Sequence, residues 1–140
     1  MACAFCAIAA AGSEAQIVFE DELTLGFLDN RPLFEGHTLL IPRAHHEAIW
    51  DLPDELVGPS FANVRALSVA VRDAMGASGA FVALNNIVSQ SVPHLHAHVV
   101  PRRPKDGLRG FFWPRTKYSS DERAAEVADL IRAESERRPK

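Results

Sequence analysis

Three histidines stand at alternate positions of one short, otherwise apolar segment: His94, His96 and His98. Side chains alternate between the two faces of a β-strand, so a strand here would place all three imidazoles on one face. Leu95 and Ala97 would then point into a core on the other face. Burying a row of polar rings is unfavourable unless each ring has a partner, so this pattern indicates a site rather than ordinary packing.

Imidazole is suited to chemistry at phosphorus. With an ordinary pKa of about 6.5, most of it is neutral and nucleophilic at neutral pH. Attack on a phosphate would give a phosphoramidate that water later cleaves, which divides one difficult displacement into two easier ones. The flanking rings could orient the nucleophile and donate hydrogen bonds to phosphate oxygens. The same three histidines could instead hold a metal ion.

The two cysteines, Cys3 and Cys6, have the spacing of a metal knuckle or a redox pair. Two cysteines so close together make a poor disulfide framework for a secreted domain. A structural zinc needs four ligands, so two more would have to come from elsewhere in the chain. Without them, both residues would be free thiols.

Five strands are expected from runs of β-forming residues bounded by turn signals, at residues 17–20, 23–28, 37–41, 80–85 and 94–100. A long helix is expected to begin at about Pro59, because proline is costly inside a helix, and to end near Met75. A last helix is expected from Ser119, with Glu122 completing a capping box. Its buried face would be formed by Ala124, Val127, Ala128 and Ile131.

These elements predict one α+β domain over residues 1–140, with a five-stranded antiparallel sheet and helices on one side. The tail from about residue 134 is expected to fray. The chain has 140 residues, a net charge of −3 and a pI near 6.0, which argues against nucleic acid as a partner. No apolar run reaches the roughly 18 residues of a membrane span, and residues 1–11 lack the basic start of a signal peptide. We therefore expect a cytoplasmic protein that does not bind membranes.

The segment from His94 to Val100 resembles the signature of the histidine triad (HIT) superfamily, in which histidines alternate with apolar residues. Residues 27–32, residues 36–42 and the Gln90-Ser91-Val92 segment also match, so the resemblance covers roughly residues 3–103. It implies a homodimer of α+β subunits that acts on purine nucleotides. The activity would be that of a hydrolase or nucleotidyl transferase on dinucleoside polyphosphates, nucleoside phosphoramidates or adenylylated molecules. A nucleotide-binding regulatory module with little turnover is the alternative.

The resemblance assigns roles to the histidines. His96 matches the nucleophile that becomes nucleotidylated, and His98 matches a position that binds the phosphate and the leaving group. His94 completes the catalytic triad, and Asp29 matches the acid that binds the ribose hydroxyls. The further substrate-binding positions are Asn30, Asn85, Gln90 and Ser91 for polar contacts, and Phe5, Ile8, Phe27 and Leu39 for the base.

Two features leave these assignments open. The loop at residues 85–89 is shorter than the family pattern and lacks its glycines, so either Asn85 or Asn86 could contact phosphate, and the leaving-group preference is in doubt. Phe27 and Leu39 are equally compatible with an ordinary core.

The resemblance also completes the cysteine pair. Several members of the superfamily bind a structural zinc through two cysteines and two histidines, which here correspond to Cys3, Cys6, His45 and His94. His46 is the alternative to His45. No organic cofactor is expected.

Residues 101–118 carry six basic side chains and the aromatic triplet Phe111-Phe112-Trp113. This segment is either a flap whose arginines contact phosphate or a loop that packs its aromatic residues on the dimer.

Overall fold

The computed structural model describes residues 3–11, 15–108 and 115–137. The chain divides into two compact units, Met1–Asp106 and Gly107–Lys140, and the first contains the sheet and all the histidines. In chain order its elements are α1 (Ala4–Ala11), β1 (Ile17–Glu20), β2 (Thr24–Leu28), β3 (Thr38–Pro42), η1 (Ile49–Asp51), α2 (Asp54–Ala74), β4 (Gly79–Leu84) and β5 (Ala97–Arg102).

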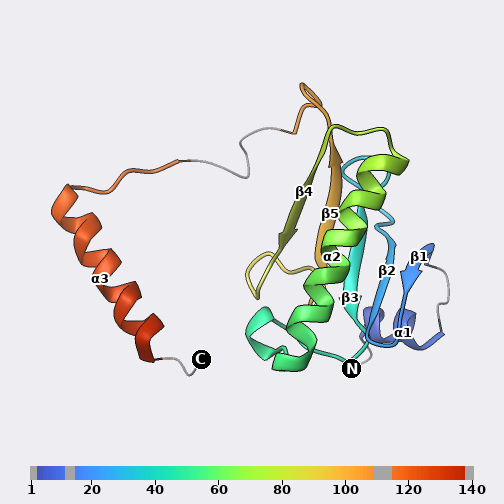
Figure 1. Cartoon of the computed structure of the whole chain (residues 1–140), viewed down its shortest axis with the longest axis horizontal. Coiled ribbons are helices and arrows are strands. Elements are labelled where there is room, and N and C mark those ends of the chain that lie inside the picture. The colour runs from blue at the N-terminus through green and yellow to red at the C-terminus, as the bar shows by residue number, and fades with distance from the viewer. Residues whose placement is uncertain (1–2, 12–14, 109–114, 138–140) are drawn as a thin grey trace. The chain divides into compact units, whose positions relative to one another are not determined.

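The five strands form one antiparallel sheet in the order β1-β2-β3-β5-β4, as Figure 1 shows. This confirms the expected α+β class and the five-stranded antiparallel sheet. Strand β5 lies between β3 and β4, with His98 opposite Leu39 on one side and Ala83 on the other. The histidine segment therefore leads into an interior strand of the sheet, which has a neighbour on each side.

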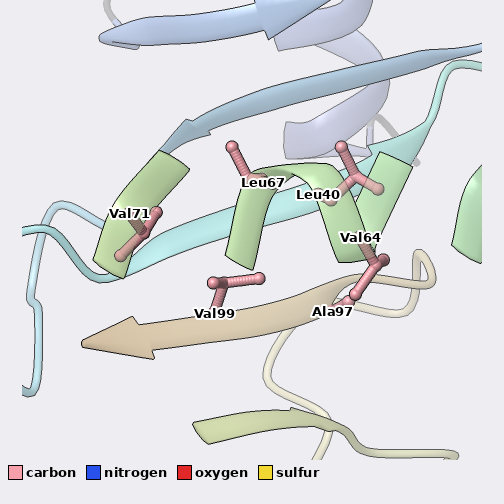
Figure 2. Packing of buried hydrophobic residues seen from close by; sticks show 6 residues of the cluster. All are labelled: Leu40, Val64, Leu67, Val71, Ala97 and Val99. Atoms are coloured by element: carbon pink, nitrogen blue, oxygen red, sulfur yellow. The ribbon is translucent and has the colours of Figure 1, made fainter. Parts of the chain in front are cut away.

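Helix α2 covers one face of this sheet (Figures 1 and 2). Its buried residues Val64, Leu67 and Val71 pack on Leu40, Ala97 and Val99 from β3 and β5. An apolar cavity of about 20 Å³ remains between the helix and the sheet, lined in part by Ser60, Leu95 and Ala97. The residues between the histidines thus point into a core, as the alternation predicts.

The opposite face of the sheet carries a second apolar cluster. It consists of Phe5, Leu25, Phe27, Leu39 and Ile41, with Ile8 packed against it. Helix α1, which supplies Phe5 and Ile8 to this cluster, was not expected from the sequence. The expectation that the helices lie on one side alone is therefore wrong.

Two predicted boundaries are also wrong. Helix α2 begins at Asp54 rather than at about Pro59, with Pro53 as its N-cap and Pro59 inside it. Two acidic residues in its first turn favour the earlier start, since they complement the helix dipole. The last strand begins at Ala97 rather than at residue 94, so His94 and His96 lie in the irregular segment that leads into it.

The second unit contains α3 (Asp121–Arg137). The Ser120 hydroxyl accepts a hydrogen bond from the amide of Arg123, so Ser120 caps the helix instead of Ser119. Within this unit by itself no described residue of α3 is buried, so the buried face expected from the sequence stays a prediction. Residues 109–114, which include Phe111, Phe112 and Trp113, lie outside the described residues. Within the described ranges, no helix is long and apolar enough to span a membrane.

Candidate active site

His96 lies at the entrance to β5 with its imidazole buried, 2% exposed. Its Nδ1 atom is 2.8 Å from the backbone carbonyl oxygen of His94. Because a carbonyl can only accept, Nδ1 must carry the proton, and the neutral ring then has its lone pair on Nε2. This is the tautomer that a nucleophilic imidazole requires.

His98 is the first triad histidine inside β5, and its ring is 5.0 Å from that of His96. Its Nδ1 atom is 2.9 Å from Nε2 of His37, a buried histidine just before β3. The amide of Leu33 donates to Nδ1 of His37 at 3.0 Å. Since an amide can only donate, neutral His37 must carry its proton on Nε2 and donate it to His98. His98 is thereby left with a proton on Nε2, as a neutral hydrogen-bond donor.

The charge of this pair is controlled by burial and by Asp29. Burial, with smaller contributions from His96 and His37, lowers the pKa of His98 to about 4. Burial also lowers the pKa of His37, opposed by the nearby Asp29 carboxylate. Asp29 Oδ2 lies 3.6 Å from His37 Nε2, and Oδ1 accepts the amide of Arg31 at 2.9 Å. Both rings are therefore neutral at pH 7.

His37 is the site residue that the sequence analysis missed. The sequence signal was a histidine directly after Gly36. It was interpreted only as the first residue of the strand predicted at residues 37–41. Gly36 has a φ of +95°, and a Cβ atom there would lie 2.6 Å from Cγ of Met75. Only glycine is suited to this turn, which delivers His37 to His98.

His94 points to a different group of side chains. Its Nδ1 atom is 3.4 Å from Sγ of Cys3 and 3.5 Å from Sγ of Cys6, and Cys6 Sγ is 3.3 Å from Nδ1 of His45. Its Nε2 atom is 2.8 Å from the carbonyl oxygen of Pro42, which fixes the proton on Nε2 and leaves the Nδ1 lone pair facing the sulfurs. The four predicted metal ligands thus converge, with His45 rather than His46 among them.

This donor set fits zinc. With bonds of about 2.3 Å to sulfur and 2.0–2.1 Å to nitrogen, a tetrahedral zinc holds its sulfur and nitrogen ligands about 3.6 Å apart. The observed separations of 3.3–3.5 Å are close to that value. The Pro42 carbonyl is the kind of outer partner that orients a metal-bound imidazole.

A metal held jointly by the three triad histidines does not match this geometry. Among the described residues, His94 groups with the cysteines, and His98 groups with His37 and Asp29. The second group is a poor metal site, because the nitrogen of His37 that faces His98 already carries a proton. The histidine row therefore divides between two separate sets of partners.

The apolar positions predicted to line the base pocket lie together. Phe5, Phe27 and Leu39 are buried in one cluster, and Ile8 packs against it. The Phe5 ring stands edge-on to the rings of Phe27, His94 and His96, at 5.3, 6.0 and 5.1 Å. This cluster adjoins the histidines on the same face of the sheet.

The polar positions predicted to bind substrate are not joined to the histidines by hydrogen bonds within the described structure. Gln90 donates to the carbonyl oxygen of Glu47 at 2.7 Å and accepts from the amide of Ile87 at 3.3 Å. Asn85 is exposed and donates to the carbonyl oxygen of Ser89. Oδ1 of Asn86 accepts from the amide of Ile49 at 2.7 Å, whereas Asn85 uses its NH2 group, so these bonds do not decide between the two residues. Ser91 and Asn30 are exposed.

Comparison with known proteins places this site in a family. The HIT domain profile matches residues 11–105, which include the triad, His37 and Asp29. The chain belongs to the HIT family. A HIT relative, the adenosine 5'-monophosphoramidase of Schizosaccharomyces pombe, is 34% identical over 124 residues, covering 87% of this chain and 90% of the relative.

Two further HIT comparisons bear on the site. An adenylylsulfatase of Arabidopsis thaliana is 32% identical over 108 residues, covering 76% of this chain and 55% of that protein. The crystal structure of a zinc-bound histidine triad family protein from Mycobacterium smegmatis superposes with a TM-score of 0.73 at 37% identity. It covers 95% of this chain and 98% of that one.

Proposed function

We propose that this HIT protein is a nucleotide hydrolase or nucleotidyl transferase in which His96 attacks the α-phosphate of a purine nucleotide. The observation that carries the proposal is the hydrogen bond from His96 Nδ1 to the carbonyl oxygen of His94, which directs the ring's lone pair to Nε2. The hydrolase names of two relatives, the phosphoramidase and the adenylylsulfatase, support a nucleotide substrate.

In the first step, Nε2 of His96 forms a bond to the α-phosphorus, and the bond from phosphorus to the leaving group breaks. The Nε2 proton of His98 is placed for donation to a phosphate oxygen or to the departing atom, because His37 occupies its Nδ1. In the second step, water or another acceptor attacks phosphorus and the phosphorus–nitrogen bond breaks. His96 then returns to its original state, and the nucleoside monophosphate or its transfer product is released.

The substrate would be a dinucleoside polyphosphate, a nucleoside phosphoramidate or an adenylylated molecule. The apolar cluster of Phe5, Ile8, Phe27 and Leu39 would bind the base. Asp29 would accept hydrogen bonds from the ribose hydroxyls. Asn30, Asn85, Gln90 and Ser91 would contact the phosphates. For Gln90 this requires release of the Glu47 carbonyl.

The decisive test compares His96→Ala with wild-type protein on adenosine phosphoramidate, diadenosine polyphosphates and adenylyl sulfate. We expect turnover to fall by several orders of magnitude while nucleoside monophosphate still binds. Mass spectrometry of acid-quenched wild-type protein should detect one nucleotidyl group on His96. His46→Ala is the matched control, because it removes a nearby imidazole that has no proposed role in the reaction. Near-normal turnover by His96→Ala would refute the mechanism, and wild-type binding without turnover would identify a regulatory module.

We propose that Cys3, Cys6, His45 and His94 hold one structural zinc per chain. The zinc-bound relative and the convergence of the four donors support this assignment. When bound, the metal would cross-link the N-terminus to the segment that leads into β5. Metal analysis of untagged protein should give about one equivalent, and Cys6→Ser should lower the melting temperature. Less than about a tenth of an equivalent, with melting unchanged after chelation, would contradict it.

We further propose a cytoplasmic homodimer that needs neither nucleic acid nor a membrane. The exposed edge strand β4 is the candidate interface. Next to it, η1 is tied to the loop after β4 by the hydrogen bond from Ile49 to Asn86. These segments carry exposed apolar side chains: Trp50, Val82, Ile87 and Val88.

A further inference from the structure

The Phe5 side chain lies between the cysteines and the nucleophile. It is buried, 8% exposed, on α1, between Cys3 and Cys6 in sequence. Its ring meets His96 edge-on at a centroid distance of 5.1 Å and an interplanar angle of 85°. Cys3 and Cys6 make their close contacts with His94 and His45 instead. Phe5 is therefore the part of α1 that contacts the nucleophile.

Helix α1 depends on tertiary contacts for its position. It has only eight residues, and a helix that short is not stable alone in water. Cys3 Sγ accepts the amide of Cys6 at 3.5 Å in the first turn, and Arg43 donates to the carbonyl oxygen of Ala9 near the last. The two sulfurs at its start are the atoms that a metal would fix to His94 and His45.

His96 needs more than its hydrogen bond to keep Nε2 aimed at phosphorus. The bond to the His94 carbonyl fixes the tautomer and one edge of the ring. The ring plane is held by its neighbours, of which Phe5 and His98 make ring contacts at 5.1 and 5.0 Å. A displacement of about 1 Å in a reacting group can cost about 100-fold in rate.

We propose that Phe5 is a positioning residue for His96, and that metal binding at the Cys3–Cys6–His45–His94 site acts on the nucleophile through it. The metal fixes the start of α1, α1 seats Phe5, and Phe5 restrains the His96 ring. This inference rests on the proposed function, because it presupposes that His96 is the nucleophile. It assigns Phe5 an effect on the rate of nucleotidylation, in addition to any contact with the base.

A cycle of Phe5→Leu and metal removal tests the coupling. We expect Phe5→Leu to retain about one metal equivalent, to lose roughly 10-fold or more in the single-turnover rate of His96 nucleotidylation, and to change KM less. Chelation of wild-type protein should cause a similar loss. Chelation of Phe5→Leu should add little, because both changes remove the same restraint. If the two losses multiply, the metal acts independently of Phe5 and the proposal is wrong.

Two readouts do not depend on turnover. Chelation should speed hydrogen exchange of the α1 amides, and both chelation and Phe5→Leu should shift the ring nitrogen-15 resonances of His96 in the same direction. Unchanged His96 resonances in Phe5→Leu would overturn the proposal. Phe5→Met, whose flexible side chain can fill an irregular gap, replaces Phe5→Leu if the latter does not fold.

Leu25→Val is the control for loss of stability. Leu25 is buried in the same cluster, 1% exposed, and lies outside the ring contacts of His96. Leu25→Val should lower the melting temperature but leave the nucleotidylation rate near normal. A rate loss equal to that of Phe5→Leu would show that Phe5 acts only through packing. If His96→Ala keeps its turnover, the proposed function itself fails. If His96→Ala loses its turnover but Phe5→Leu keeps a normal nucleotidylation rate, only the proposed coupling fails.

Discussion

At the scale of single residues, backbone groups determine the chemistry of the histidines. The carbonyl of His94 accepts from Nδ1 of His96, and the carbonyl of Pro42 accepts from Nε2 of His94. The amide of Leu33 donates to Nδ1 of His37, so this nitrogen is an acceptor and carries no proton. One ring thus has its lone pair on Nε2, one has its lone pair on Nδ1 beside the cysteine sulfurs, and one fixes the tautomer of His98. Equivalent side chains differ in tautomer because their backbone partners differ.

The pKa of His98 makes stability depend on pH. The unfolded chain protonates this histidine below about pH 6.5, whereas the folded protein does so only at about pH 4. Between these values the unfolded state binds more protons, so the free energy of unfolding must fall as the pH falls through this window. His37, His96 and Asp29 face His98 and contribute to the shift. We expect a loss on the order of 1–2 kcal/mol from His98, since solvent screens part of the effect.

Urea denaturation at pH 7 and pH 5 measures this contribution as the difference between wild type and His98→Gln. Other groups titrate in the same window, but they are common to both proteins and cancel in the comparison. The variant should lose less stability on acidification. Equal losses in the two proteins would show that His98 titrates alike in the folded and unfolded states.

Asp29 is expected to bind the ribose. Asp29→Ala should weaken nucleoside monophosphate binding by about 1.5–3 kcal/mol, the usual range for hydrogen bonds to a charged group. Because a carboxylate accepts from a diol, the loss should be larger for ribonucleotides than for dideoxy analogues. Calorimetric titration with both ligands measures the difference. If the losses are equal, Asp29 acts only through its neighbours His37 and Arg31.

At the scale of elements, the sequence predicted the sheet and the division between its faces, but it misplaced the start of β5. Alternation correctly placed Leu95 and Ala97 toward the core that α2 covers. It could not show that the strand begins at Ala97, because Leu95 bonds to the carbonyl oxygen of His46 instead of continuing a ladder. This irregular entry allows His94 to turn to the cysteines while His96 and His98 stay together.

The parts of the site that the sequence could not provide depend on contacts between distant segments. Cys3, Cys6, His45 and His94 were assigned together by resemblance, and the structure brings them together. The His37–His98 bond joins residues 61 positions apart, and no local pattern marks it. Helix α1 was missed because it has no charged residue in its first or last turn and forms through tertiary packing.

Helix α2 contains a polar defect that can be removed. Ser60 is 7% exposed, and its hydroxyl has no hydrogen-bond partner among the described residues. A buried, unpaired hydroxyl costs about 1–3 kcal/mol, and alanine is the better helix former. Ser60→Ala should therefore raise the free energy of unfolding by about 1 kcal/mol. Thermal unfolding should show a higher melting temperature.

Ser68 on the same helix provides the matched control. Its hydroxyl donates to the carbonyl oxygen of Val64 at 2.8 Å, so Ser68→Ala removes a satisfied group. We expect that variant to change stability less than Ser60→Ala, within about 0.5 kcal/mol of wild type. If Ser60→Ala destabilises the protein, its hydroxyl has a partner in solution and the cavity beside it is not an apolar defect.

At the scale of the molecule, the sheet separates stability from chemistry. The face under α2 is a core of aliphatic side chains, whereas the other face carries α1, the histidines and the cysteine pair. Strand β5 belongs to both, with Ala97 and Val99 on one side and His98 on the other. The segment that carries His96 thus leads directly into a strand that is paired on both sides, whereas the surrounding loops tolerate more variation.

The sheet also leaves two edges, β1 and β4, and they differ in what surrounds them. An unprotected edge strand tends to pair with another chain. Strand β4 has six residues, contains the exposed Val82 at 44%, and is followed by the exposed Ile87 and Val88. Strand β1 has only four residues and a register irregularity next to Val18. We therefore expect two copies to associate through β4 about a two-fold axis, the commonest symmetry of homo-oligomers.

Val82→Lys should break this dimer, because it places a charge at the centre of the interface on both copies at once. Light scattering should give about twice the 15.4 kDa of one chain for the wild type and a single-chain mass for the variant. Val18→Lys puts the same charge on the other edge, at a residue 48% exposed, and should remain dimeric. A wild-type protein that is monomeric at working concentration would rule out the dimer. Dissociation by Val18→Lys but not by Val82→Lys would move the interface to β1.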